Sequence, residues 1–292
     1  MFEQQYQKMS EAPGFVAALD QSGGSTPKTL QRYGLEQWEN EAEMFDLVHA
    51  MRSRIMASRS FDGDRILATI LFAQTVDREV AGQPTPRFLW DVKHIVPIVK
   101  VDRGLEAEVD GAQLMKPIDD LDEMVQAAGK KGVFGTKMRS VVRGPGAGAE
   151  AAVAQQLYLG RRILEGGLVP ILEPEVDIAS PHKAEAERHV HDLLAAGLDD
   201  LPEGERVMLK LTLPEHDDLY ADLVAHPRVL RVFALSGGYS RAEATARLAR
   251  QHGVVASFAR ALMEGLNVNQ SDEEFDAMLD ASIEEIFAAS MA

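Results

Sequence analysis

Lys210 stands in the middle of a short apolar run, Arg206-Val207-Met208-Leu209-Lys210-Leu211-Thr212-Leu213-Pro214. A polar segment and a proline bound the run, which is typical of a buried strand. A lysine there is costly to keep charged, because removal from water disfavours the ammonium form. Two interpretations follow. The lysine stem is buried and the amine reaches water at the sheet edge, or an uncharged amine forms a Schiff base with a carbonyl substrate.

Composition narrows the class of protein. The chain has 292 residues, a mass of 32.0 kDa, no cysteine and a formal net charge of -16. Disulfides, thiolate metal sites and a cysteine nucleophile are therefore excluded. The acidity disfavours nucleic acid and anionic membranes as partners, because both require a basic face. We find neither a signal peptide nor a membrane-spanning run, so we expect a cytoplasmic protein.

Seven further apolar runs are typical of strands, and amphipathic patterns separate them. With residues 207–213, the predicted strands are 14–20, 65–72, 95–101, 132–139, 167–175, 231–238 and 253–258. The predicted helices are 1–12, a helix after the turn at 21–27, 36–57, 120–130, 149–165, 181–197, 217–225, 240–251 and 271–289. We expect Ser25 or Thr26 to cap the second of these, with Pro27 in its first turn. The loop at 102–117 is long, which indicates a function or a small excursion.

Eight strands that alternate with helices predict a parallel sheet, and this chain length favours closure into a (β/α)8 TIM barrel. We therefore expect one α/β domain over residues 1–292, with extra helices at both termini. An open dinucleotide-binding sheet is disfavoured, because Ser22-Gly23-Gly24-Ser25 is not the glycine fingerprint of that fold.

Charged residues gather where the predicted strands end, which is where barrels of this kind carry their reactive groups. The ends hold Asp20, Lys100 with Asp102, Lys137 with Arg139, Glu173 with Glu175, Lys210, and Arg260. Each has a structural explanation; Arg139, for example, could pair with Glu175 at the rim. Together they predict a functional cleft, because packing needs no ring of charge at one mouth. Repulsion from Lys137 would also help to keep the Lys210 amine uncharged.

Ser236-Gly237-Gly238 follows the seventh strand, where such barrels commonly bind phosphate through loop amides. An ordinary glycine turn is the alternative. Arg260 favours the phosphate interpretation, since a guanidinium fork matches phosphate oxygens. An anionic substrate with more than one phosphate would explain the cations in so acidic a chain. The histidines are scattered, and His189 and His191 do not form a zinc set.

These residues carry a resemblance to class I fructose-bisphosphate aldolases of the shorter bacterial type. The resemblance spans nearly the whole chain. No single matching segment is diagnostic, but the segments taken together in this order are specific for the family. The matching segments are Ala17-Ala18-Leu19-Asp20-Gln21-Ser22-Gly23-Gly24-Ser25, Val99-Lys100-Val101-Asp102-Arg103-Gly104, Gly135-Thr136-Lys137-Met138-Arg139, Val169-Pro170-Ile171-Leu172-Glu173-Pro174-Glu175, Met208-Leu209-Lys210, Leu235-Ser236-Gly237-Gly238 and Ser257-Phe258-Ala259-Arg260-Ala261-Leu262.

The resemblance implies a role for each matching residue. Lys210 would form the Schiff base, Glu173 would dehydrate the carbinolamine, and Asp20 would act at bond cleavage. Lys137 would join them as the fourth catalytic residue. The substrate-binding residues would be Lys100, Arg139, Glu175, Ser22, Ser25, Ser236, Gly237, Gly238, Ser257 and Arg260, with the 236–238 loop and Arg260 on the phosphate nearer the ketone.

Three positions depart from the larger animal-type members. Thr29 stands where those carry an arginine, which removes one phosphate contact. Met138 replaces a tryptophan. The chain ends in Ser290-Met291-Ala292 rather than a functional tyrosine, so we carry no tail mechanism over.

The resemblance implies reversible cleavage of fructose 1,6-bisphosphate into two triose phosphates, with a Schiff base and no metal or other cofactor. Its partners would be the phosphorylated ketose and the triose phosphates, and a homo-oligomer is compatible with it. One alternative is a class I aldolase for sedoheptulose or tagatose bisphosphate. The other is a sugar-phosphate-binding protein without turnover.

Overall fold

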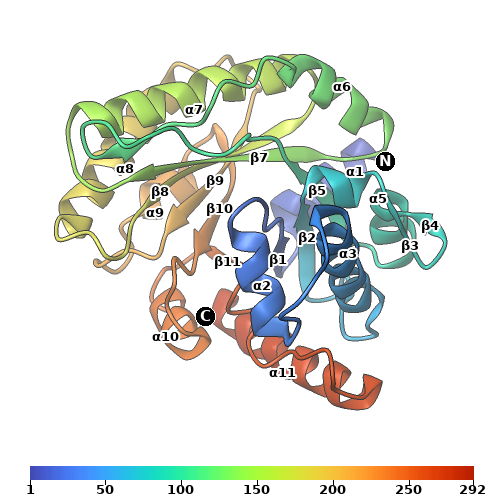
Figure 1. Ribbon diagram of the computed structural model, residues 1–292. Helices are drawn as coiled ribbons and strands as arrows, with labels where there is room; N and C mark the ends of the chain where they lie inside the picture. Colours follow the sequence, from blue (N-terminus) through green and yellow to red (C-terminus); the bar gives the residue numbers. More distant parts are fainter.

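A computed structural model describes residues 1–292 and shows a closed barrel of parallel strands wrapped by helices (Figure 1). The barrel strands are β1 (Phe15–Leu19), β2 (Ile66–Leu71), β5 (Val96–Lys100), β7 (Gly135–Val142), β8 (Val169–Val176), β9 (Val207–Thr212), β10 (Val229–Leu235) and β11 (Val255–Phe258). Each pairs in parallel with its neighbours, and the pairing of β5 with β7 closes the ring. The predicted TIM barrel and all eight predicted strands are confirmed.

Helices of very different length cover the barrel. They are α1 (Phe2–Glu11), α2 (Ser25–Tyr33), α3 (Glu41–Ala57), α4 (Ala73–Val76), α5 (Thr85–Arg87), α6 (Leu121–Lys130), α7 (Ala147–Glu165), α8 (Lys183–Asp199), α9 (Ala221–Ala225), α10 (Arg241–Leu248) and α11 (Asp272–Ser290), with a π-helical turn η1 at Phe88–Val92. The expected extra helices are α1 and α11. None of the helices is long and apolar enough to cross a bilayer.

The α2 cap differs from the expectation. Gly24 is the residue before the helix, and Ser25 and Thr26 already lie within its first turn, as Pro27 does. The Ser25 hydroxyl donates to the Ser22 carbonyl at 2.9 Å instead of capping the helix. The serine therefore closes the loop between β1 and α2, while no side chain caps this helix.

Two connections carry small structures of their own. The long loop after β5 is an excursion: its β6 (Ala112–Gln113) runs antiparallel to β7, and Leu105 bridges to Met115. Residues 73–94, for which the sequence predicts no element, hold α4, α5, η1 and the hairpin of β3 (Glu79–Val80) and β4 (Gln83–Pro84). Elements this short lack the repeated apolar pattern that sequence interpretation requires.

The core divides into two layers because successive strand residues face opposite sides. Inward-facing residues fill the lower barrel in a cluster that includes Val16, Ile98, Ile171, Met208 and Phe233. The α1 helix adds Met9 to this cluster and so closes the amino-terminal end of the barrel. The outward-facing residues join the larger cluster under the surrounding helices. The buried charged residues Asp20, Lys137, Glu173 and Lys210 lie above the inner apolar cluster, toward the carboxyl-terminal mouth.

Candidate active site

Strand alternation places the charged residues inside the mouth. Met208 is in the inner apolar cluster, so Lys210, two residues further on, faces the same way one layer higher. The same step leads from Ile171 to Glu173. On the neighbouring strands, Lys137 pairs in register with Ile171 and lies level with Lys100. On β8 and β9 the lower layer is therefore apolar, and the layer above it carries Glu173 and Lys210.

Four of the predicted residues form a continuous chain of contacts. Lys210 Nζ lies 3.0 Å from Glu173 Oε1, and Glu173 Oε2 lies 2.9 Å from Lys137 Nζ. Lys137 Nζ in turn lies 2.6 Å from Asp20 Oδ2. All four residues are at least nine-tenths buried. Two lysines and two carboxylates therefore alternate within one desolvated cluster.

The lysines keep both carboxylates ionised. Burial by itself would raise the pKa of Asp20, but Lys137, Lys210 and Lys100 overcome this and hold that pKa well below its usual range. Glu173 behaves likewise, since attraction to Lys137 and Lys210 outweighs burial and lowers its pKa. Burial by itself would lower the pKa of Lys137, but attraction to Asp20 and Glu173 outweighs burial and raises that pKa. The resting cluster is thus a set of buried ion pairs.

The sequence led us to expect that repulsion from Lys137 helps to keep Lys210 uncharged, and the structure places Glu173 between these two lysines. The charge of Lys137 is balanced by its own contacts with Asp20 and Glu173. Lys210 Nζ has the other Glu173 oxygen, Oε1, beside it at 3.0 Å. The same oxygen is within reach of the Lys210 proton, and its neighbour Oε2 has no aligned hydrogen bond. The geometry supports proton transfer from Lys210 to Glu173 as the source of the free amine.

Lys100 lies on β5, beside Lys137 of β7, and links two loops. Its Nζ lies 2.8 Å from Asp102 Oδ1 and donates to Ser22 Oγ at 2.9 Å. The Ser25 hydroxyl holds Ser22 through the main chain, and Asp102 Oδ2 accepts from the Arg139 amide at 3.2 Å. Lys100, Ser22 and Ser25 thus form one polar corner.

Arg139 and Glu175 form the rim pair that the sequence allowed. Arg139 Nη1 donates to Glu175 Oε2 at 2.9 Å, and the arginine side chain is 40% exposed. Both residues follow the inward-facing pattern of β7 and β8. The pair lies above the buried lysines, so its guanidinium is accessible to a ligand that enters the mouth.

The 236–238 loop follows β10, next to the strand that carries Lys210. Leu235, the last residue of β10, pairs with Thr212, two residues beyond Lys210. The Ser236 carbonyl accepts from the amides of Gly238 and Tyr239, at 2.6 and 2.9 Å. Gly238 has a φ of +130°, which disfavours any side chain there. The turn thus uses two of the amides that could have bound an anion.

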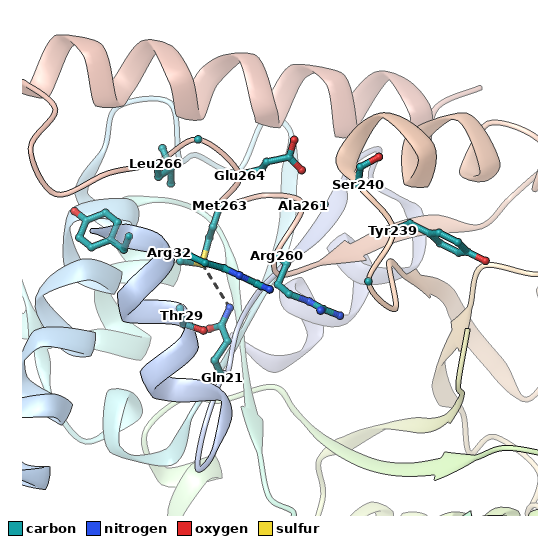
Figure 2. A pocket seen from close by; sticks show the side chains of 13 residues that line it. Gln21, Thr29, Arg32, Tyr239, Ser240, Arg260, Ala261, Met263, Glu264 and Leu266 are labelled. Carbon is teal, nitrogen blue, oxygen red and sulfur yellow. Dashed lines mark hydrogen bonds between the residues drawn. The ribbon is translucent and has the colours of Figure 1, made fainter. Parts of the chain in front are cut away.

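A cavity of about 380 Å³ opens beside this loop (Figure 2). Its lining includes Gln21, which follows Asp20, together with Gly238 and Arg260. A β-carbon at Gly238 would lie 3.5 Å from Arg260 Nη2, so the loop and the guanidinium are in contact. The buried lysines are not part of the lining. The cavity adjoins them through Gln21, which follows Asp20 of the cluster in the sequence.

Ser257 completes the predicted set near the end of β11. It is 2% exposed, and its hydroxyl has no hydrogen-bond partner in the protein. Val255, two residues earlier, belongs to the inner apolar cluster, so Ser257 also faces the barrel interior. An unpartnered buried hydroxyl at this level is available to a substrate.

Two buried residues that support the site were missed by the sequence analysis. Gln156 of α7 accepts from the Glu173 amide and donates to the Met138 carbonyl and Ser140 hydroxyl, which fixes β8 beside β7. Arg52 of α3 donates to the Gln21 carbonyl and to Thr75 Oγ1, the latter at 2.8 Å. Burial lowers the pKa of Arg52 to about 10, although attraction to Asp20 opposes this. Gln156 and Arg52 could have been recognised in the sequence, because each is a polar residue on the apolar face of a helix.

The histidines take part in surface contacts. His191 lies between Asp192 and Asp222, and His189 lies 3.8 Å from Glu150. No group of three or more histidine, cysteine, aspartate or glutamate side chains is arranged to hold a metal ion.

Comparison with solved structures supports the TIM-barrel fold. A fructose-bisphosphate aldolase of Plasmodium falciparum, solved in complex with TRAP and a small-molecule inhibitor, superposes with a TM-score of 0.78. The two sequences are 22% identical, and the match covers 99% of this chain and 93% of the other. At this identity the likeness establishes a shared TIM-barrel fold.

Sequence relatives identify the family. The model of the class-I fructose-bisphosphate aldolase family matches residues 3–215. A class 1 fructose-bisphosphate aldolase of Synechocystis is 57% identical over 99% of this chain and 97% of its own length. Relatives of the same name from Porphyromonas gingivalis and Clostridium acetobutylicum are 52% and 48% identical over the full length of both chains. The chain belongs to the class I fructose-bisphosphate aldolase family, a family of lyases.

Proposed function

We propose that this chain cleaves fructose 1,6-bisphosphate reversibly into dihydroxyacetone phosphate and glyceraldehyde 3-phosphate, through a Schiff base on Lys210. The observation that carries the proposal is the 3.0 Å contact between Lys210 Nζ and Glu173 Oε1 at the barrel mouth. An amine beside a carboxylate can lose its proton, attack a ketone and receive the proton back at the departing oxygen.

The first half of the reaction forms the iminium. Lys210 passes a proton to Glu173, and its amine attacks the C2 ketone to give a carbinolamine. Glu173 then protonates the carbinolamine hydroxyl, which leaves as water. The product is a positively charged carbon–nitrogen double bond. Lys137 contacts the other oxygen of Glu173 and so holds the carboxylate in place through both steps.

The second half breaks the C3–C4 bond. Asp20 takes the proton from the C4 hydroxyl, the aldehyde product forms, and the bonding electrons move into the iminium to leave an enamine. The three lysines that lower the pKa of Asp20 ensure that it is ionised when substrate arrives. Protonation at C3 and hydrolysis release dihydroxyacetone phosphate and restore Lys210. Because the iminium accepts the electrons, we propose that no metal or other cofactor takes part.

Substrate charge and hydroxyls have partners around the mouth. Lys100 with Ser22 and Ser25, and Arg139 with Glu175, are proposed to bind the aldehyde-side portion of the sugar. The 236–238 loop and Arg260 are proposed to bind the phosphate nearer the ketone, and Ser257 a polar group beside it. We further propose that residues 1–292 form one domain and that the enzyme acts in the cytoplasm.

The proposal is tested by assaying cleavage of the fructose, tagatose and sedoheptulose bisphosphates, each with and without EDTA. We expect fructose 1,6-bisphosphate to have the highest kcat/KM and EDTA to leave the rate unchanged. A higher kcat/KM with either other sugar would reassign the substrate. Activity that disappears with EDTA would contradict the imine mechanism, and binding without cleavage would indicate a sugar-phosphate-binding protein.

A further inference from the structure

We propose that Arg32, on α2, supplies a second guanidinium to the phosphate nearer the ketone and acts together with Arg260. This inference rests on the proposed function, because it names a further residue of the same substrate site. Neither the matching segments nor the charged strand ends include Arg32, since it lies within a helix.

The cavity beside the 236–238 loop brings the two arginines together. Arg32 and Arg260 both line it, although they are 228 positions apart in the chain. Figure 2 shows Arg32 extending from α2 toward Arg260. The Arg260 guanidinium itself lies beside Gly238. Two positive side chains thus share one concave space of about 380 Å³.

Both guanidinium groups lack a partner in the protein. The only hydrogen bond between two lining side chains runs from Gln21 to Met263 (Figure 2). The one acidic residue of the lining, Glu264, accepts from the Arg241 amide and points away from the two arginines. Other arginines, such as Arg65 and Arg143, pair with carboxylates. In a chain of net charge -16, two free cations in one cavity indicate an anionic ligand.

Phosphate chemistry fits this pair. Two like charges in one cavity repel each other, and a phosphate ester of charge about -1.5 to -2 would neutralise them. The loop alone offers few donors, because the amides of Gly238 and Tyr239 already bond to the Ser236 carbonyl. Side-chain donors must therefore supply a larger part of the site.

Helix geometry explains how Arg32 reaches the cavity. Helical side chains lean toward the amino terminus, so a residue covers the surface over the preceding turn. Thr29 lies one turn before Arg32, lines the same cavity, and turns its hydroxyl to the Ser25 carbonyl at 3.0 Å. The short Thr29 side chain leaves this space open, and the longer Arg32 side chain reaches into it from one turn further along the helix.

The test compares Arg32→Gln with a matched control, Arg188→Gln, which removes an exposed arginine from α8. Fructose 1-phosphate and fructose 1,6-bisphosphate share the ketone-side phosphate. We therefore expect Arg32→Gln to raise KM about ten- to hundredfold for both sugars by a similar factor, with kcat changed less than about threefold. The control should match the wild type. Unchanged KM values, or a rise for the bisphosphate alone, would overturn the assignment.

A second measurement does not depend on turnover. Calorimetry with inorganic phosphate should show weaker binding to Arg32→Gln than to the wild type and to Arg188→Gln. The double variant Thr29→Arg with Arg32→Gln should recover part of the affinity, since it places a guanidinium in the same cavity. If wild-type protein cleaves no sugar, the proposed function fails, while the phosphate measurement still decides the role of Arg32. Equal phosphate affinity in all variants would reject that role.

Discussion

Glu173 Oε1 lies 3.0 Å from Lys210 Nζ, with both side chains at least nine-tenths buried at the mouth of the barrel. The two residues face each other because their strands, β8 and β9, are neighbours that place Ile171 opposite Met208 one layer below. The contact gives the proposed nucleophile its proton acceptor. Without this contact, Lys210 would have no base in the protein to take its proton.

Replacement of Glu173 by glutamine should slow catalysis without removing the nucleophile. A neutral amide can neither take the Lys210 proton nor deliver it to the carbinolamine. We expect kcat to fall about 10²- to 10⁴-fold, the usual range for loss of an acid–base group. Glu185→Gln, at an exposed position of α8, is the control. A rate within a factor of a few of wild type would exclude Glu173 from this role.

Asp20→Asn should separate Schiff-base formation from bond cleavage. The asparagine cannot accept the C4 hydroxyl proton, so cleavage of fructose 1,6-bisphosphate should fall about 10²-fold or more. Lys210 and Glu173 remain, so borohydride should still trap dihydroxyacetone phosphate on the variant. The measurement is the ratio of trapped adduct to cleavage rate. If both fall together, Asp20 acts before the cleavage step.

Lys137→Met should destabilise the fold as well as the site. Lys137 lies between Asp20 and Glu173, and its loss leaves two buried carboxylates without their shared cation. Breaking a buried pair in this way costs about 3–5 kcal/mol. Urea unfolding monitored by circular dichroism should show a lower midpoint at pH 7. An unchanged midpoint would show that the cluster does not depend on Lys137.

The stability of the protein should fall on acidification partly through Asp20. Its pKa is lower in the folded protein than in the unfolded chain, so the unfolded chain binds the proton first as pH falls. The stabilisation is present above the unfolded value of about 3.9 and is lost as pH falls from there toward the folded value. Urea unfolding between about pH 5 and 2 should show a shallower loss for Asp20→Asn than for wild type. Parallel curves would contradict the shifted pKa.

The sequence predicted the barrel well because its strands are apolar runs with regular spacing. Residues at strand ends, such as Glu173 and Lys210, could be assigned to one mouth from topology alone. Arg32, Arg52 and Gln156 could not be assigned to the mouth in this way, because each lies on a helix and is brought near the site only by tertiary contacts. The ionisation of Asp20 and Glu173 could not be predicted from the sequence either, since it depends on which carboxylate oxygen each lysine contacts.

Borohydride trapping shows directly whether Lys210 forms the covalent bond to the sugar. Wild-type protein is reduced in the presence of dihydroxyacetone phosphate, digested, and mapped by mass spectrometry, with Lys210→Met as a folded variant for comparison. We expect one adduct, on the peptide that contains Lys210, and neither adduct nor cleavage in the variant. An adduct on Lys137 or Lys100, or cleavage that persists in Lys210→Met, would contradict this expectation.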